Sequence, residues 1–377
     1  MKIGDKRRLR RDPLAYLEDL HRRSTGDVIR LPWGGWCVGD ADLAHDLLRD
    51  PEFNGDRSEF FGDLLPTRAA QIDVGHAVRD FLRARVPRYR TALAEAVAEL
   101  PSVSHWPDAG TALAYGCLAD LLLYPGTPAG TRRLLARAVD GGVVVRPTRL
   151  WERVQAEVVR GKLITAVAGQ VARRREHPAA EPRDVLDVVL GACALTDRLV
   201  AEVYLTMVRA VVAPIGMMTA WSVLLACLRN PADGAWPWPV DQIVREALRF
   251  RPMPWMLGRT LAKPTRVGGV SLRAGATVSV SPYLVHHDEQ RWSDAKVFRP
   301  ERWACPSGHG PSVSFGAGPF TCPGASLAQV LIADTLTALT RDATLAVAGG
   351  DVRPVLSEHA IPRPFTVRRT MTDSGRR

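Results

Sequence analysis

A glycine-rich segment near the C-terminus, residues 315–324, presents one cysteine and leads directly into an Ala- and Leu-rich stretch. The segment reads Phe-Gly-Ala-Gly-Pro-Phe-Thr-Cys-Pro-Gly, and the stretch that follows, Ala325 to Leu339, is predicted to be a helix. A helix N-terminus stabilises a thiolate through its dipole and its free backbone N–H groups, which suits an anionic metal ligand. Gly316 and Gly318 allow sharp turns and a close approach to a flat ligand, against which Phe315 can pack. The alternative interpretation is a buried free cysteine in a turn, because free cysteines are among the most buried residues.

The pattern Phe-x-x-Gly-x-x-x-Cys-x-Gly, which contains Cys322 and ends at Gly324, resembles the heme-binding loop of the cytochrome P450 superfamily. Two upstream segments also resemble that family. They are a Glu-x-x-Arg at residues 246–249 and a Pro-Glu-Arg-Trp at residues 300–303, where the family has Pro-Glu-Arg-Phe. The resemblance extends over nearly the whole chain and is most specific around residues 246–330. It implies a heme b cofactor whose iron is ligated by the Cys322 thiolate.

The resemblance also assigns roles to residues around these motifs. By this resemblance, Glu246, Arg249 and Arg302 form a buried charge triad behind the cysteine loop, which holds the loop and takes no part in the chemistry. His286 and His287 match a structural segment of the family and receive no catalytic role. Three residues of the loop are expected beside the heme: Phe315, Gly316 and Gly324.

The heme propionates need cationic partners. The family commonly has Arg or His two residues before the cysteine, but this chain has Phe320 there. The resemblance makes Arg259 the expected propionate ligand. His76 resembles the first residue of the family's His-x-x-x-Arg element, although an aspartate occupies the arginine position, so Arg79 or Arg83 is expected to substitute. A purely structural His76 is the alternative.

Length alone suggests two or three domains, but the lack of a linker leads us to expect one large globular domain spanning residues 1–377. The chain has 377 residues with 46% hydrophobic content, and no stretch reads as a linker. The Pro- and Trp-rich residues 234–239 are interpreted as a tight connection between helices. Apolar periodicity predicts helices at residues 13–24, 40–49, 76–100, 110–123, 130–141, 149–175, 183–192 and 196–229. Strands are predicted at residues 28–31, 36–38, 266–272 and 277–280, with a hairpin around residues 345–347 and 365–367. The result is a mainly α fold with small peripheral β-sheets, consistent with the cytochrome P450 fold that the resemblance implies.

The predicted helix at residues 196–229 departs from the family pattern. The family usually carries an acid followed by a threonine there, and these relay protons to bound oxygen. Residues 203–232 of this chain contain no Asp or Glu, and the hydroxyls near the expected place are those of Thr219 and Ser222. Water or a substrate hydroxyl is therefore expected to supply the protons, with Thr219 as the candidate catalytic side chain. Pro214 cannot donate a backbone hydrogen bond and should kink or open the helix, either as a modified oxygen-binding groove or as a mere kink in a buried helix.

The net charge and the pattern of cysteines limit which binding partners and which cellular location we expect. The net charge is +10, but no recognition motif accompanies it, so nucleic acid is not an expected partner. An arginine cluster at residues 79–90 is either a solvated helix face or a docking site for an acidic, ferredoxin-type electron donor. The basic N-terminus lacks an apolar core, so no signal peptide or membrane anchor is expected. The six cysteines have no metal-finger or disulfide spacing, which indicates a reducing cytoplasm.

These observations predict a heme-thiolate monooxygenase that inserts oxygen from O₂ into a hydrophobic small molecule in specialised metabolism such as antibiotic biosynthesis. One alternative is a heme-thiolate enzyme that uses peroxide, or that rearranges or couples its substrate, with Arg209 orienting an anionic substrate. The other alternative is a heme-binding relative without enzymatic activity. By the resemblance, substrate contacts are expected from residues 53–74, 209–219, 253–257 and 358–362.

Overall fold

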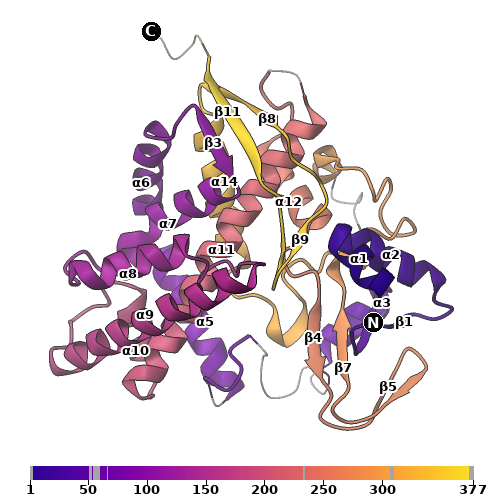
Figure 1. The fold of residues 1–377 in the computed structure, drawn as a ribbon, viewed down its shortest axis with the longest axis horizontal. Coiled ribbons are helices and arrows are strands. Elements are labelled where there is room, and N and C mark those ends of the chain that lie inside the picture. The colour runs from indigo at the N-terminus through magenta and orange to yellow at the C-terminus, as the bar shows by residue number, and fades with distance from the viewer. Residues whose placement is uncertain are drawn as a thin grey trace.

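The structure is a computed structural model of residues 1–377 and describes residues 3–50, 53, 60–65, 67–231, 234–305 and 310–372. A long helix, α11 (Asp197–Arg229), runs through the middle of the molecule (Figure 1). It contacts α7 (Asp108–Leu122), α9 (Leu150–Glu176), α12 (Val240–Phe250) and α14 (Ala325–Thr340). By length and apolar composition α11 could cross a membrane, but 83% of its most apolar window is buried inside the fold, as in a core helix.

The other helices surround this centre. They include α5 (Arg68–Arg83) and α6 (Val86–Ala98), where the sequence predicted one helix over residues 76–100. That prediction was wrong because the helix is interrupted at Ala84 and Arg85, just before Pro87, and because it starts earlier. Thr67 caps α5 by accepting a hydrogen bond from the Ala70 N–H at 3.2 Å. The remaining helices are α1 (Ile3–Arg11), α2 (Pro13–Arg23), α3 (Ala41–Arg49), α8 (Ala129–Asp140), α10 (Val185–Ala192) and α13 (Pro282–His286), with 3₁₀ helices at η1 (Pro300–Ala304) and η2 (Gly318–Phe320).

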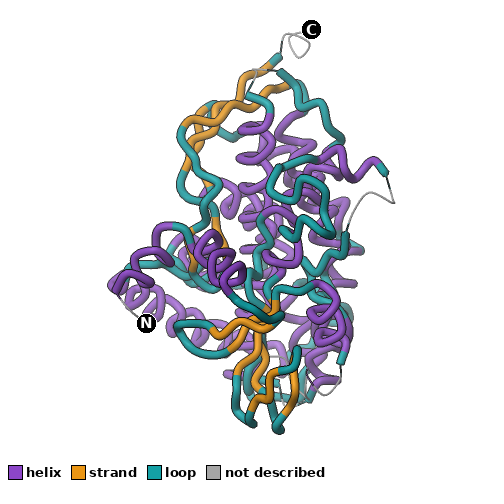
Figure 2. Tube along the Cα trace, turned by 90° about the vertical axis from the view of Figure 1, so that its right-hand side faces the viewer, coloured by secondary structure: helices purple, strands orange, loops and turns teal. Residues whose placement is uncertain are grey.

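Two of the sheets lie at opposite ends of the helical mass (Figures 1 and 2). At one end is a four-stranded sheet in the order β1-β2-β7-β4. Only its β2–β7 pair is parallel. These strands are β1 (Val28–Arg30), β2 (Trp36–Val38), β4 (Leu257–Thr260) and β7 (Thr277–Val280), with the separate hairpin β5 (Thr265–Val267) and β6 (Val270–Leu272).

The sheet at the other end contains the predicted C-terminal hairpin. In it β8 (Ala343–Ala348) pairs antiparallel with β11 (Phe365–Met371), and Val347 lies opposite Val367. A third strand, β3 (Val103–Trp106), pairs with the other edge of β11 and was not predicted. The small hairpin of β9 (Val355–Leu356) and β10 (Ala360–Ile361) was also missed, because two-residue strands show no alternation. The mainly α architecture with small peripheral sheets is confirmed.

Candidate functional site

The cysteine loop joins η2 to α14 and exposes Cys322 at the helix N-terminus. Gly316 and Gly318 have φ values of +73° and +68°, a left-handed conformation that favours glycine, as the sequence predicted. The Cys322 N–H donates to the Phe315 carbonyl at 2.9 Å, which closes the loop. A Cβ on Gly318 would lie 2.4 Å from the Leu48 carbonyl oxygen, so the loop packs tightly against the end of α3. Two features therefore set the loop shape, its glycines and one backbone hydrogen bond.

Two opposing effects act on the pKa of the Cys322 thiol, and the one that raises it is the larger. Surrounding protein atoms desolvate the thiol and raise its pKa, while a backbone hydrogen bond from Gly324 lowers it by a smaller amount. The helix N-terminus alone therefore does not make this thiol a thiolate, contrary to the simplest expectation from its position. A coordinated metal ion deprotonates a thiol by itself, so the residue remains chemically suited to ligation. A Cβ on Gly324 would lie 3.8 Å from the sulfur, in ordinary van der Waals contact with it.

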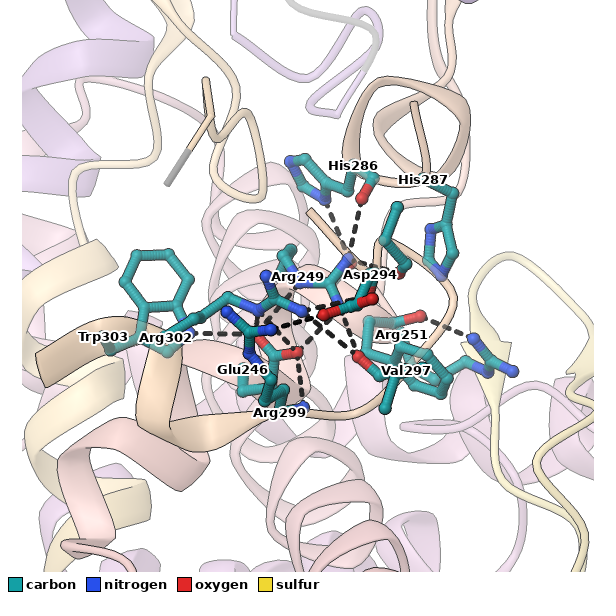
Figure 3. Close-up of polar contacts among 12 residues, drawn as sticks. Glu246, Arg249, Arg251, His286, His287, Asp294, Val297, Arg299, Arg302 and Trp303 are labelled. Carbon is teal, nitrogen blue, oxygen red and sulfur yellow. Dashed lines mark hydrogen bonds and ion pairs between the residues drawn. The ribbon is translucent and has the colours of Figure 1, made fainter. Parts of the chain in front are cut away.

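The predicted charge triad is present and fully enclosed (Figure 3). Both oxygens of Glu246 accept hydrogen bonds from Arg249, at 2.9 and 2.7 Å. The Nε of Arg302 donates to Glu246 at 3.1 Å. Glu246 and Arg249 are 0% exposed and Arg302 is 3% exposed. A buried charge of this kind is tolerated only with its partners in place.

Further donors complete the shell of Glu246. The indole of Trp303 donates to it at 3.0 Å, a bond that the phenylalanine usual in the family cannot make. The Arg299 backbone N–H donates at 2.9 Å. Arg249 in turn donates to the carbonyls of His286 at 2.7 Å and Ala295 at 2.8 Å. The triad thus ties α12 to the segment that leads into the cysteine loop.

His286 connects the triad to the cysteine loop, a role that sequence reasoning missed. Its Nδ1 lies 3.1 Å from the Arg249 carbonyl oxygen, and its Nε2 accepts the Val313 N–H at 2.9 Å. Because Nε2 is an acceptor, the neutral ring carries its proton on Nδ1. Burial and the nearby Arg249 charge lower the pKa of His286 to about 3, which keeps the ring neutral. Ser314 adds a second tie by donating to the Leu248 carbonyl at 3.1 Å.

Helix α5 lies beside the cysteine loop. A Cβ on Gly75 would meet the Pro323 ring at 2.9 Å, and Arg83 donates to the Ser326 hydroxyl of α14 at 2.8 Å. On the same helix His76 is exposed. Arg79 is occupied by its neighbour, because its Nε and one terminal nitrogen donate to Asp80 at 2.8 and 2.9 Å. The structure therefore brings α5 to the loop but directs Arg79 towards an acid of its own helix.

The other expected propionate ligand, Arg259, lies on β4. Its side chain is half-buried, and one terminal nitrogen donates to the Gly258 carbonyl at 2.6 Å. Strand β4 pairs with β7 through the register Arg259 to Val278. Phe315 is half-buried and packs against the main hydrophobic core. The Phe320 side chain lies outside the part of the chain that the structure describes.

Helix α11 has one open face. From Val200 to Cys227, the residues that are not fully buried are Glu202, Thr206, Arg209, Ala210, Val211 and Pro214. Thr206, Ala210 and Pro214 follow one another at spacings of four, which places them on the same face. Pro214 cannot donate to the Ala210 carbonyl, so the missing hydrogen bond of the helix also lies on this face. The helix nevertheless continues through Pro214 to Arg229.

Thr219 lies away from that face, which does not favour its predicted role. It follows Ala210 by about two and a half helical turns and therefore points to the opposite side. It is 1% exposed, and its hydroxyl donates to the Ile215 carbonyl at 2.7 Å. Ser222 is engaged in the same way with the Met218 carbonyl. Gly216 also faces away, since a Cβ there would lie 2.6 Å from the Thr111 Cα of α7.

Comparisons with known proteins agree with this geometry. Residues 240–364 match the family model described as Cytochrome P450. A steroid 17-alpha-hydroxylase/17,20 lyase of Ictalurus punctatus is 32% identical over 124 residues, which are 31% of this chain and 24% of that protein. The matched part thus spans about a quarter of the length of such curated relatives.

Solved structures extend the likeness to nearly the whole chain. Cytochrome P450 TbtJ1, in its ligand-free structure, has a TM-score of 0.76 at 20% identity and covers 95% of this chain and 97% of its own. P450 EryK from S. erythraea has a TM-score of 0.74 at 21% identity and covers 96% of each chain. A mutant of EryK has been solved in complex with erythromycin B.

Fold and site together define a helical protein that presents a single cysteine at a helix N-terminus, braced by a buried Glu-Arg-Arg network. Residues 240–364 match the cytochrome P450 family model, and nearly the whole chain has the fold of solved cytochromes P450. Proteins of this family bind heme b. The residues present fit that group, because the exposed Cys322 thiol would be a suitable iron ligand and the left-handed glycines shape the loop that carries it.

Proposed function

We propose that this chain is a heme-thiolate monooxygenase that oxidises a hydrophobic small molecule with O₂ and two electrons from a ferredoxin-type donor. The observation that carries the proposal is Cys322, exposed at the start of α14 on a loop that a buried hydrogen-bond network fixes. Bound heme supplies the iron centre at which oxygen is activated. Cys322 ligates it, and Phe315, Gly316 and Gly324 form the surface against which it lies.

The remaining binding residues follow from position and charge. Arg259 is proposed to meet a propionate from β4, with His76 and Arg79 as further candidates from α5. Arg79 can take this role only by leaving Asp80, to which two of its nitrogens donate hydrogen bonds.

Proton delivery must differ from the family pattern. The stretch 203–232 offers no acid, and the hydroxyl of Thr219 is turned inward. We assign the role to water or to a substrate hydroxyl beside Ala210 and Pro214, where the proline removes the N–H that would bond the Ala210 carbonyl. Thr206 on the same face donates to the Glu202 carbonyl at 2.9 Å. Its oxygen remains free to accept a second bond.

The carbon monoxide spectrum of the reduced holoprotein tests the ligand. Thiolate ligation predicts a red-shifted Soret band, which Cys322→Ala should lose. Cys305→Ala is the matched control, because Cys305 is the other exposed cysteine among the described residues. A wild-type spectrum typical of histidine ligation would refute the assignment of Cys322.

A peroxide-using enzyme is the second candidate, favoured by the missing acid and by the burial of Thr219. Turnover with NAD(P)H, a reductase and a ferredoxin, compared with turnover on peroxide alone, separates the two. Turnover only with peroxide would replace the first proposal. Absence of turnover in both arms, with heme bound, would support a non-enzymatic relative.

The substrate is proposed to belong to specialised metabolism. The support is the likeness in fold to P450 EryK, a mutant of which was solved with erythromycin B. A screen of natural products for the substrate-induced shift of the heme spin state, read by absorbance, tests this directly.

A further inference from the structure

Three charged side chains meet beside the open face of α11. Arg209 of α11 forms an ion pair with Glu358, which lies in the turn of the β9–β10 hairpin. Arg146, in the segment between α8 and α9, pairs with the other oxygen of Glu358 at 3.4 Å. We call Arg146, Arg209 and Glu358 the Arg209 cluster. It places two guanidinium groups on one carboxylate and therefore carries one uncompensated positive charge.

Two buried polar atoms in and next to the Arg209 cluster lack partners. Among the residues that the structure describes, neither Arg209 Nε nor His359 Nδ1 has a hydrogen-bond partner, although both atoms are buried. Such atoms are rare in folded proteins, because leaving a buried donor unpaired is costly. Burial lowers the pKa of His359, so its ring is neutral and can donate from Nδ1. Both orphaned atoms can thus serve an acceptor, and an anion supplies one.

The fold fixes the hairpin against α11 (Figure 1). The indole of Trp221 on α11 donates to the Ala360 carbonyl at 3.0 Å. The Ala360 N–H donates to the Met253 carbonyl at 3.1 Å. Glu358 is consequently held within reach of Arg209, which is adjacent in sequence to Ala210 on the open face. The side chains of Arg209 and Glu358 are 35% and 40% exposed, so an entering ligand can reach them.

We propose that the Arg209 cluster is a binding subsite for the carboxylate of an amphipathic substrate, with Glu358 as an internal stand-in for that carboxylate. The incoming group pairs with the guanidinium of Arg209 and accepts from its Nε, while Glu358 turns to solvent or keeps Arg146. The apolar part of the substrate then lies along Ala210 and Pro214. This inference rests on the proposed function and narrows its substrate class from hydrophobic molecules to those with a carboxylate.

The probe pair is decanoate and decan-1-ol, which share a chain and differ in charge. Calorimetric titration of the holoprotein should show decanoate binding more tightly than the alcohol. Arg209→Gln should weaken decanoate binding by about 10- to 100-fold, the range expected for one charge-assisted pair, and should leave decan-1-ol unchanged. Glu358→Gln should strengthen decanoate binding, because it removes the competing carboxylate. Arg160→Gln, on the exposed surface of α9, is the matched charge control and should change neither ligand.

A ligand subsite predicts that decanoate affinity falls in Arg209→Gln and rises in Glu358→Gln, whereas a purely structural ion pair predicts no such opposite changes. If both variants weaken decanoate equally, or if decan-1-ol loses affinity in parallel, the cluster is structural and the inference is overturned. Equal binding of the two probes to wild type also overturns it. Thermal unfolding of each variant confirms that it is folded. The titration does not depend on turnover or on the carbon monoxide band, so failure of the subsite and failure of the proposed function are read separately.

Discussion

At the scale of single residues, His286 shows how a buried neutral histidine can hold a functional loop. It contacts the Arg249 carbonyl with one nitrogen and the Val313 N–H with the other. His286→Ala should leave both backbone groups unpaired, at a cost of about 1–3 kcal/mol each if no water replaces the ring. Because Val313 begins the turn that leads to Cys322, the variant should also lose part of the red-shifted Soret band of the carbon monoxide complex.

His287→Phe provides the control for that prediction. His287 follows His286 directly and packs on Tyr283, with the two ring centroids 4.0 Å apart. Its hydrogen bond, however, goes to the Tyr283 carbonyl at its own helix and not to the cysteine loop. This variant should keep the Soret band whatever it does to stability. A His286→Ala protein that retains the full band would show that Ser314 and the glycines hold the loop unaided.

The same two histidines predict how stability depends on pH. Burial and the neighbouring arginines hold the pKa of His287 well below its usual value and that of His286 at about 3. Just below 6.5, the usual pKa of histidine, both rings are neutral in the folded protein, whereas the unfolded chain takes up protons. Stability should therefore decrease as the pH falls from about 7.5 to about 5.5, as measured by urea unfolding. His287→Phe should make this decrease smaller, and an unchanged slope would contradict the argument.

At the scale of elements, the cysteine loop and the triad could be predicted from the sequence, while the orientation of α11 could not. The glycines, the cysteine and the Glu-x-x-Arg pair are short motifs that resemble those of the cytochrome P450 family, and that resemblance implied how they meet. Helix α11 is buried on almost every side, so its apolar pattern has no polar face from which to read a direction. The inward position of Thr219 appears only once α7 and α9 pack around the helix. The contact between Arg209 and Glu358, residues far apart in the sequence, is likewise a product of tertiary packing.

Pro214 gives α11 a test of its own. Pro214→Ala restores the N–H that can bond to the Ala210 carbonyl, and it should stabilise the protein by about 1–3 kcal/mol because an interior proline costs roughly 3 kcal/mol. The same bond closes the open face, so product formed per electron delivered should fall. Thr219→Ala is the comparison and should reduce turnover by less than about tenfold, since its hydroxyl already serves Ile215. A loss of about 10²–10⁴-fold in Thr219→Ala would instead identify Thr219 as the relay.

At the scale of the whole molecule, some arginines that contribute to the positive net charge are paired with acids, while others are exposed to a partner. The chain carries +10 overall. Around the cysteine loop, however, Arg79 is neutralised by Asp80 and Arg90 by Asp334, at 2.8 Å in each case. Arg83 and Arg88 remain exposed, and Arg83 donates to the neutral hydroxyl of Ser326 on α14. An acidic electron donor that approaches this face would therefore meet Arg83 next to α14, the helix that follows Cys322.

Arg83→Glu tests whether this face receives the electron donor. Reversing the charge should slow reduction of the heme by a ferredoxin several-fold or more at low ionic strength, because complementary charge mainly accelerates encounter. The effect should shrink as salt approaches about 1 M, where the screening length is about 3 Å. Arg160→Glu on α9 changes the net charge equally and should slow reduction less. Reduction by dithionite, which needs no docked protein, should be the same in both variants. Equal slowing by the two reversals would mean that the net charge, and not the surface beside Cys322, governs the encounter.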